Sequence, residues 1–154
     1  MNDTLKIFKK FQILRPNEIS GAYMHNLSDL EKYELSKTTR VWGYINSLTF
    51  EIAKDLELDT NDKSILLNAS LLIHNSIFEQ DDKKTENSYN EMFSQMSKTK
   101  VLKEIFAEAA KDAMRDMLNI RNNVKDDTPS SSISNFPRLD NWIISYCRSL
   151  KDNK

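Results

Sequence analysis

Glycine and proline are scarce in this sequence, with 2 glycines and 3 prolines among 154 residues. Tight β-hairpin turns depend on glycine, usually within Asn-Gly or Asp-Gly, and neither dipeptide occurs here. The rest of the chain is rich in residues that favour helices, so we expect an all-α fold. The same scarcity excludes the glycine-rich loops that bind phosphate groups in nucleotide-binding proteins.

Residues that bind metals or act as nucleophiles are equally few. The chain has 1 cysteine, Cys147, and 2 histidines, His25 and His74. A structural zinc site needs about four Cys or His ligands, and a single cysteine cannot form an internal disulfide. We therefore expect no enzyme activity, no metal and no other cofactor.

Charge and hydropathy give no indication of a nucleic-acid or membrane partner. The formal net charge is -1, so no strong positive field favours nucleic acid. Lys6, Lys9 and Lys10 interrupt the apolar residues at the N-terminus, which is unlike a signal peptide. Apolar runs elsewhere are too short to cross a bilayer. We expect no nucleic-acid binding, no membrane insertion and a cytoplasmic location.

Apolar residues recur at helical spacing in about six stretches, which we interpret as the helices of one domain over residues 1–154. Ser28 followed by Glu31 is the pattern of a capping box at the start of the second stretch. Trp42-Gly43 marks a candidate break within that stretch. The predicted helices span residues 3–14, 28–56, 61–80, 87–96, 98–125 and 139–150.

The third stretch is apolar on nearly all sides between Ile65 and Phe78. A helix of this kind is usually buried among other helices. We expect it to be the central helix of the fold, with Leu66, Ala69, Leu72, Ile73 and Ile77 mostly buried.

His74 lies on this predicted central helix. It has two interpretations: a ligand or pH-sensitive group, or a core histidine whose hydrogen bonds are satisfied, which is the one that we favour. If the helix lines an apolar pocket instead, the candidate lining residues are His74, Leu72, Ile73 and Phe78.

Charged and polar residues mark two further segments. Glu104, Glu108, Asp112 and Asp116 repeat every fourth residue, and we interpret them as an exposed helix face because lysine and arginine alternate with them. Residues 126–135 carry a proline and a serine run without apolar periodicity. We expect this segment to be a mobile linker.

The last predicted helix has more large apolar residues than one buried face needs. Ile143, Tyr146, Cys147 and Leu150 are enough to pack it on the core, so Trp142 and Ile144 are expected to point elsewhere. Tryptophan and tyrosine often dominate the binding energy of protein interfaces. The candidate residues for an interface with a partner protein or a second copy are Phe136, Trp142, Ile144 and Tyr146.

The predicted helices at 61–80, 87–96, 98–125 and 139–150 resemble the second half of a globin in their layout. Haem would need a proximal histidine on the helix at 87–96, which has none. The resemblance therefore implies a haem-less globin-like sensor domain that binds a small apolar ligand. Two hypotheses follow: a non-catalytic regulatory protein that binds another protein, which we favour, and this sensor domain.

Overall fold

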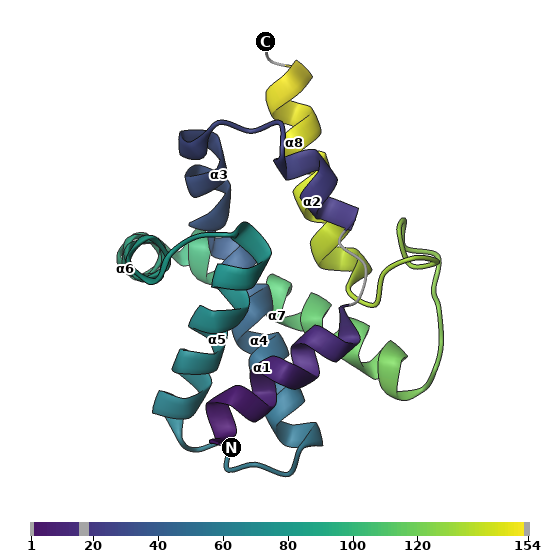
Figure 1. Cartoon of the computed structure of the whole chain (residues 1–154). Coiled ribbons are helices and arrows are strands. Elements are labelled where there is room, and N and C mark those ends of the chain that lie inside the picture. The colour runs from purple at the N-terminus through teal and green to yellow at the C-terminus, as the bar shows by residue number, and fades with distance from the viewer. Residues whose placement is uncertain (1, 16–18, 153–154) are drawn as a thin grey trace.

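The computed structural model describes residues 2–15 and 19–152, and within them every regular element is a helix (Figure 1). The predicted all-α class is confirmed. The helices of this part of the chain are α1 (Asp3–Leu14), α2 (Ile19–Met24), α3 (Asp29–Ser36), α4 (Thr39–Asp55), α5 (Lys63–Phe78), α6 (Asp82–Met96), α7 (Lys100–Arg121) and α8 (Pro137–Asp152).

Polar side chains cap the start of most helices, which explains where these elements begin. The predicted capping box is confirmed, because the Ser28 hydroxyl accepts from the Glu31 N–H and the Glu31 carboxylate accepts from the Ser28 N–H. Thr38 caps α4 in the same way by accepting from the Val41 N–H. Each cap satisfies a backbone donor that the helix itself cannot satisfy.

Two features make the number of helices larger than the expected six. The short helix α2 lies in a stretch without an expected helix. The stretch at 28–56 divides into α3 and α4, but the division falls at Lys37 and Thr38 instead of Trp42-Gly43. Thr38 causes it, because an N-cap residue leaves the helical conformation in order to cap the next helix.

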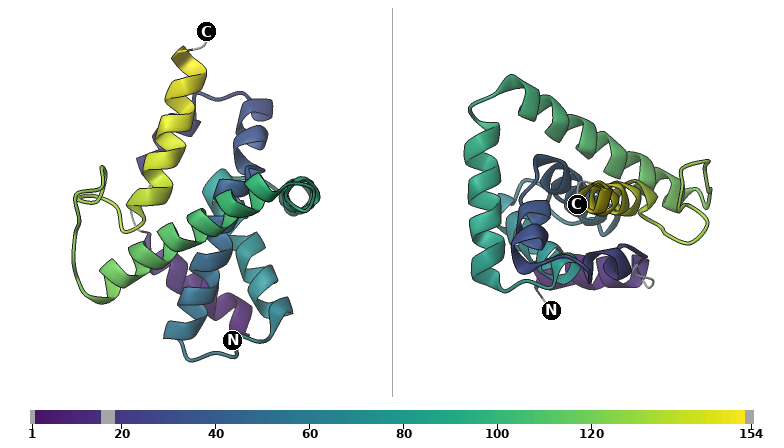
Figure 2. Two further views of the ribbon diagram at one scale, coloured as in Figure 1. Left: turned by 180° about the vertical axis from the view of Figure 1, so that it is seen from behind. Right: turned by 90° about the horizontal axis from the view of Figure 1, so that it is seen from above.

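The central helix is α4, and the expectation that the helix from Ile65 to Phe78 is central is wrong. Nearly every turn of α4 is buried, including polar residues such as Thr49 and Glu51. It packs most extensively on α7 and also contacts α1, α3, α5 and α6 (Figure 2). Helix α5 buries Ala69, Ile73 and Ile77 as expected, but it leaves Leu67 exposed and Leu66 and Leu72 only half-buried.

Gly43 explains why α4 and α7 pack so closely. A Cβ atom at this position would lie 2.5 Å from the backbone oxygen of Phe106 and 3.1 Å from the Cβ of Ala109. Only a residue without a side chain fits this contact. The glycine therefore permits helix packing and does not break α4.

Helix α8 extends away from the end of α7, with α2 beside it (Figure 1). A loop of residues 122–136 joins α7 to α8 and returns the chain toward the core. Phe136, at the end of this loop, is completely buried and stacks on Phe11 of α1 with ring centroids 5.9 Å apart. Among the described residues, no helix combines the length and apolar character that crossing a membrane requires.

Candidate functional site

Five helices line a groove of about 880 Å³. Its walls are α3 and the start of α4, the second half of α6, the first turns of α7, and the middle of α8. The helices around it appear in Figure 2, where α7 runs below α8 and α6 is viewed along its axis in the left panel. We call this feature the groove.

Apolar and aromatic side chains form one part of the groove. Trp142 and Tyr146 are one turn apart on α8 and half-buried, with their ring centroids 5.5 Å apart. Met92 of α6 is a buried part of the lining, and Leu102 and Ile105 of α7 add half-buried aliphatic surface. The groove therefore offers rigid aromatic surface that the chain itself leaves partly uncovered.

Another part of the groove is polar and surrounds the N-terminus of α4. Lys37 Nζ lies 3.0 Å from Glu34 Oε2 and 3.5 Å from Glu91 Oε2. The hydrogen bond to Glu34 is the main cause that raises the pKa of Lys37, so this lysine remains charged at neutral pH. Arg40 pairs with Asp112 of α7 at 2.9 Å.

A buried polar cluster holds α3, α4, α5 and α6 together beside the groove. His74 of α5 is 0% exposed, and its ring stacks on Trp42 of α4 with centroids 4.1 Å apart and planes 7° apart. His74 Nε2 lies 2.7 Å from the carbonyl oxygen of Ser36, the last residue of α3. Thr85 and Ser88 of α6 complete the cluster, which we call the His74 centre.

The hydrogen bonds of the His74 centre determine which nitrogen of the imidazole carries the proton. A carbonyl oxygen can only accept, so His74 Nε2 donates to Ser36 O. Nδ1 is then the acceptor for the Thr85 hydroxyl at 3.4 Å. Burial lowers the pKa of His74 to about 4, against the smaller opposing effect of the Ser36 carbonyl. The neutral imidazole is therefore the form that fits this site.

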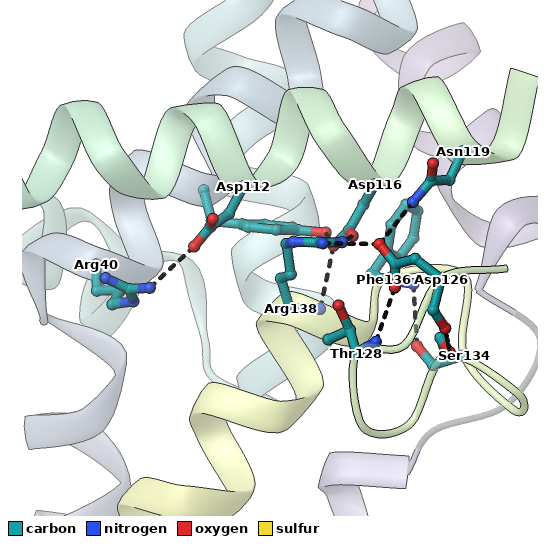
Figure 3. Close-up of polar contacts among 11 residues, drawn as sticks. Arg40, Asp112, Asp116, Asn119, Asp126, Thr128, Ser134, Phe136 and Arg138 are labelled. Atoms are coloured by element: carbon teal, nitrogen blue, oxygen red, sulfur yellow. Dashed lines mark hydrogen bonds and ion pairs between the residues drawn. The ribbon is translucent and has the colours of Figure 1, made fainter.

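A second buried cluster fixes the start of α8 against α4 and α7 (Figure 3). Asp116 is 1% exposed, and its carboxylate accepts from the Tyr44 hydroxyl at 2.7 Å and from Arg138 Nη1 at 2.6 Å. It also accepts from the backbone N–H of Arg138 in the first turn of α8, where a carboxylate interacts well with the helix dipole. Arg138 Nη2 reaches Asp126 at 2.7 Å. We call Asp116, Tyr44, Arg138 and Asp126 the Asp116 centre.

The acidic groups of this centre respond differently to their surroundings. Burial raises the pKa of Asp116, although the hydrogen bonds from Tyr44 and Arg138 oppose that effect. The Arg138 guanidinium, together with the Thr128 N–H, holds the pKa of Asp126 well below its usual range. Asp126 therefore remains an anion that anchors the loop to α8.

The loop at 126–135 has more polar contacts than the sequence suggested. Asp126 accepts from Asn119 and from the Thr128 N–H, and the Ser131 hydroxyl donates to the Asp126 carbonyl (Figure 3). Ser134 donates to buried Asp140, which also pairs with Arg15. The expectation of a mobile linker did not include these polar contacts, which offset part of the entropy of ordering. The mobility of the segment stays a prediction.

The candidate pocket residues do not come together at a cavity. His74, Ile73 and Phe78 are each 0% exposed because neighbouring side chains cover them completely. Leu72 is half-buried and lines a smaller hollow of about 260 Å³ on another side of α5, together with Leu71 and Asn75. The placement of His74 agrees with a core histidine whose hydrogen bonds are satisfied.

The candidate interface residues fall into two groups. Trp142 and Tyr146 lie together in the groove, so the sequence identified two of its aromatic lining residues. Phe136 is completely buried, and Ile144 is 6% exposed. The expectation that Phe136 and Ile144 point away from the core is therefore wrong, because both side chains help to pack α8.

Sequence reasoning missed two parts of this arrangement. Asp116 was assigned to an exposed ladder, but it lies three residues after Ala113 and next to Met117, both of which are buried. This spacing places it on the buried face of α7, so a usable signal was present. The polar side of the groove, at Lys37 and Arg40, depends on contacts with α6 and α7 that the local sequence does not contain.

Comparison with known proteins adds no functional information. No protein family, curated protein or solved structure matches this chain. In the residues that the structure describes, no group of three or more His, Cys, Asp or Glu side chains is placed to hold a metal ion.

Proposed function

We propose that this chain is a non-catalytic regulatory module that binds another protein through the groove. The observation that carries this proposal is the half-buried Trp142–Tyr146 pair in a hollow of about 880 Å³. Tryptophan and tyrosine contribute large contact area and lose little conformational entropy on binding. Met92, Leu102 and Ile105 extend the apolar surface beside them.

The shape of the groove supports a helix or other short segment as its occupant. Amphipathic helices bind proteins by laying their apolar face into a groove between helices. The two buried centres support such binding, because they fix the walls before a partner arrives. A preformed site reduces the entropy that association costs.

The alternative is the haem-less globin-like sensor domain with a small apolar ligand in the same groove. Its support is the volume, because ligand pockets commonly measure about 300–1,000 Å³ and the groove falls in this range. The ligand would then contact Trp142 and Tyr146, since His74 is covered by its neighbours.

Three further expectations belong to the same proposal. When the bound protein is a second copy of this chain, the product is a homodimer with α8 in its interface. A cytoplasmic location agrees with a single buried cysteine, Cys147. Nucleic acid is not expected as a partner, because the formal net charge is -1.

Two matched variants test this proposal. Trp142→Ala removes groove surface, whereas Phe93→Ala removes an exposed aromatic ring of α6 that does not line the groove. The association of each variant is measured by native mass spectrometry, either as complexes cross-linked in the source cell or as dimers of the chain. Trp142→Ala is expected to weaken association by about 2 kcal/mol, the lower bound of an interface hot spot. Phe93→Ala is expected to leave it unchanged.

The outcome distinguishes the alternatives. A retained small molecule that is lost in Trp142→Ala would favour the sensor domain. Equal association of the two variants, with helical content unchanged by circular dichroism, would contradict a binding site in the groove.

A further inference from the structure

The polar side of the groove contains hydrogen-bond donors that have no acceptor in the chain. Thr39 lines the groove and is 7% exposed, yet its hydroxyl forms no hydrogen bond among the described residues. The backbone N–H groups of Thr39 and Arg40, in the first turn of α4, likewise have no partner there. Thr38 caps only the N–H of Val41. The Thr39 hydroxyl is not itself closed off from solvent, so a ligand in the groove can reach it together with these two N–H groups.

Two aromatic side chains of the groove also carry free donors. The indole N–H of Trp142 and the hydroxyl of Tyr146 make no hydrogen bond within the part of the chain that the structure describes. The carboxylates of the lining, in contrast, are already occupied. Glu34 and Glu91 both pair with Lys37, and Glu91 also accepts from the Tyr33 hydroxyl. These free donors suit a ligand that supplies acceptors, although Asn90, Ser94 and Gln95 of the lining offer both donors and acceptors.

Charge at this point also favours an acceptor that is an anion. The N-terminus of an α-helix carries a partial positive charge, and α4 is 17 residues long. Lys37 and Arg40, each about one-third exposed, flank its first turn. Glu34, Glu91 and Asp112 neutralise these side chains in the free protein, so the opposing carboxylates limit the gain. A compact anion that reaches the helix N-terminus itself avoids much of that opposition.

We propose that the partner of the groove is an amphipathic helix with an Asp or Glu carboxylate beside its apolar face. The carboxylate accepts hydrogen bonds from the Thr39 hydroxyl and from the N–H groups of Thr39 and Arg40. The apolar face lies on Trp142 and Tyr146 at the same time. This inference rests on the proposed function, because it names the chemistry of the partner in the same groove.

The chain offers variants that move the affinity in opposite directions. Thr39→Val keeps the shape of the side chain and removes only its hydroxyl. Asp112→Asn removes the charge that holds Arg40, and therefore leaves the guanidinium free for the incoming carboxylate. Thr60→Val, in the turn between α4 and α5, is the matched control for Thr39→Val.

The experiment titrates the full chain with two tryptophan-free helical peptides and follows tryptophan fluorescence. Both peptides have the same leucine face, and one carries glutamate where the other carries glutamine beside that face. The glutamate peptide is expected to bind about twofold to fivefold more tightly, the range for an anion at a helix N-terminus. Thr39→Val is expected to reduce this preference, Asp112→Asn to increase it, and Thr60→Val to leave it unchanged. Added salt is expected to decrease the preference.

The possible results separate this inference from the proposed function. Equal affinities of the two peptides, both weakened by Trp142→Ala, would overturn the carboxylate site and leave the groove as a protein-binding site. A preference that Thr39→Val does not alter would overturn it as well. Binding of neither peptide at millimolar concentration would contradict both the inference and the proposed function.

Discussion

The two walls of the groove are held by buried polar clusters of different chemistry. The His74 centre joins α3, α4, α5 and α6 without a formal charge, through stacked rings and hydrogen bonds to neutral groups. The Asp116 centre joins α4, α7 and α8 through a carboxylate and a guanidinium. Two residues of α4 on either side of Gly43 take part, because Trp42 belongs to the first centre and Tyr44 to the second.

This difference in charge determines which solution conditions destabilise each cluster. The His74 centre has no exposed member among His74, Trp42, Ser36, Thr85 and Ser88, so salt cannot screen it and only protonation disturbs it. Arg138 of the Asp116 centre is 21% exposed, so water and salt reach one partner of a pair whose other partner is buried. The fold therefore secures one groove by two contacts that respond to different conditions.

The largest effect is expected when the buried carboxylate is removed. Asp116→Ala leaves the Tyr44 hydroxyl, Arg138 and the first turn of α8 without their common acceptor. Breaking a buried charged pair in this way costs about 3–5 kcal/mol. We expect that decrease in the free energy of unfolding, as measured by urea denaturation.

A control for this variant lies one turn earlier on the same helix. Asp112 pairs with Arg40, and both side chains are about one-third exposed. Asp112→Asn is expected to cost less than about 1 kcal/mol, as for other solvent-accessible ion pairs. If the free energy of unfolding decreased by a similar amount in both variants, burial would not explain the contribution of Asp116.

Acid is expected to weaken the His74 centre next. The pKa of His74 is about 4 in the folded chain, against 6.5 for an ordinary histidine. Above pH 6.5 the imidazole is neutral in both states, and between 6.5 and 4 only the unfolded chain takes up the proton. Stability therefore decreases as pH falls through this window, by about 3 kcal/mol at about 1.4 kcal/mol per pH unit, and this loss is complete near pH 4. Urea denaturation at a series of pH values measures it.

Two variants assign this pH dependence to one residue. His74→Phe keeps a ring between Trp42 and Phe78 but cannot be protonated, so the decrease between pH 6.5 and 5 should disappear. His25→Gln replaces an exposed histidine and should retain it. An unchanged slope in His74→Phe would refute the assignment.

Local sequence patterns predicted the helical class and several helix starts. Which helix is central depended on packing between helices. The sequence around Ser28 contains both halves of a capping box, so it was recognisable without any long-range contact. The apolar character of α5 misled the choice of the central helix, because Leu66, Leu67 and Leu72 remain partly exposed. Helix α4 contains buried polar residues that satisfy each other across helices, as Thr49 does with Ser70, and these conceal its central position.

The candidate site was predictable only in part for the same reason. Trp142 and Tyr146 were identifiable because the last helix has more aromatic surface than its packing requires. The free donors at Thr39 could not be recognised, because a threonine after an N-cap is ordinary until other helices enclose it. The groove itself arises from the relative placement of five helices, which no local pattern encodes.

The smallest of these effects concerns the residue between the two centres. Gly43→Ala would place a Cβ 2.5 Å from the Phe106 carbonyl oxygen, so α7 must move away from α4. Overpacking costs about 1–3 kcal/mol, and the better helix propensity of alanine returns about 0.5–1 kcal/mol, so we expect a net loss between about 0 and 2.5 kcal/mol. Because α7 carries Asp116 and α5 carries His74, the change should loosen only the Asp116 centre. Hydrogen exchange by NMR reports on both, since the Arg138 N–H donates to Asp116 and the Trp42 indole N–H donates to Ser88. We expect faster exchange at Arg138 and little change at Trp42, whereas equal acceleration of both protons would mean that the two centres form one cooperative unit.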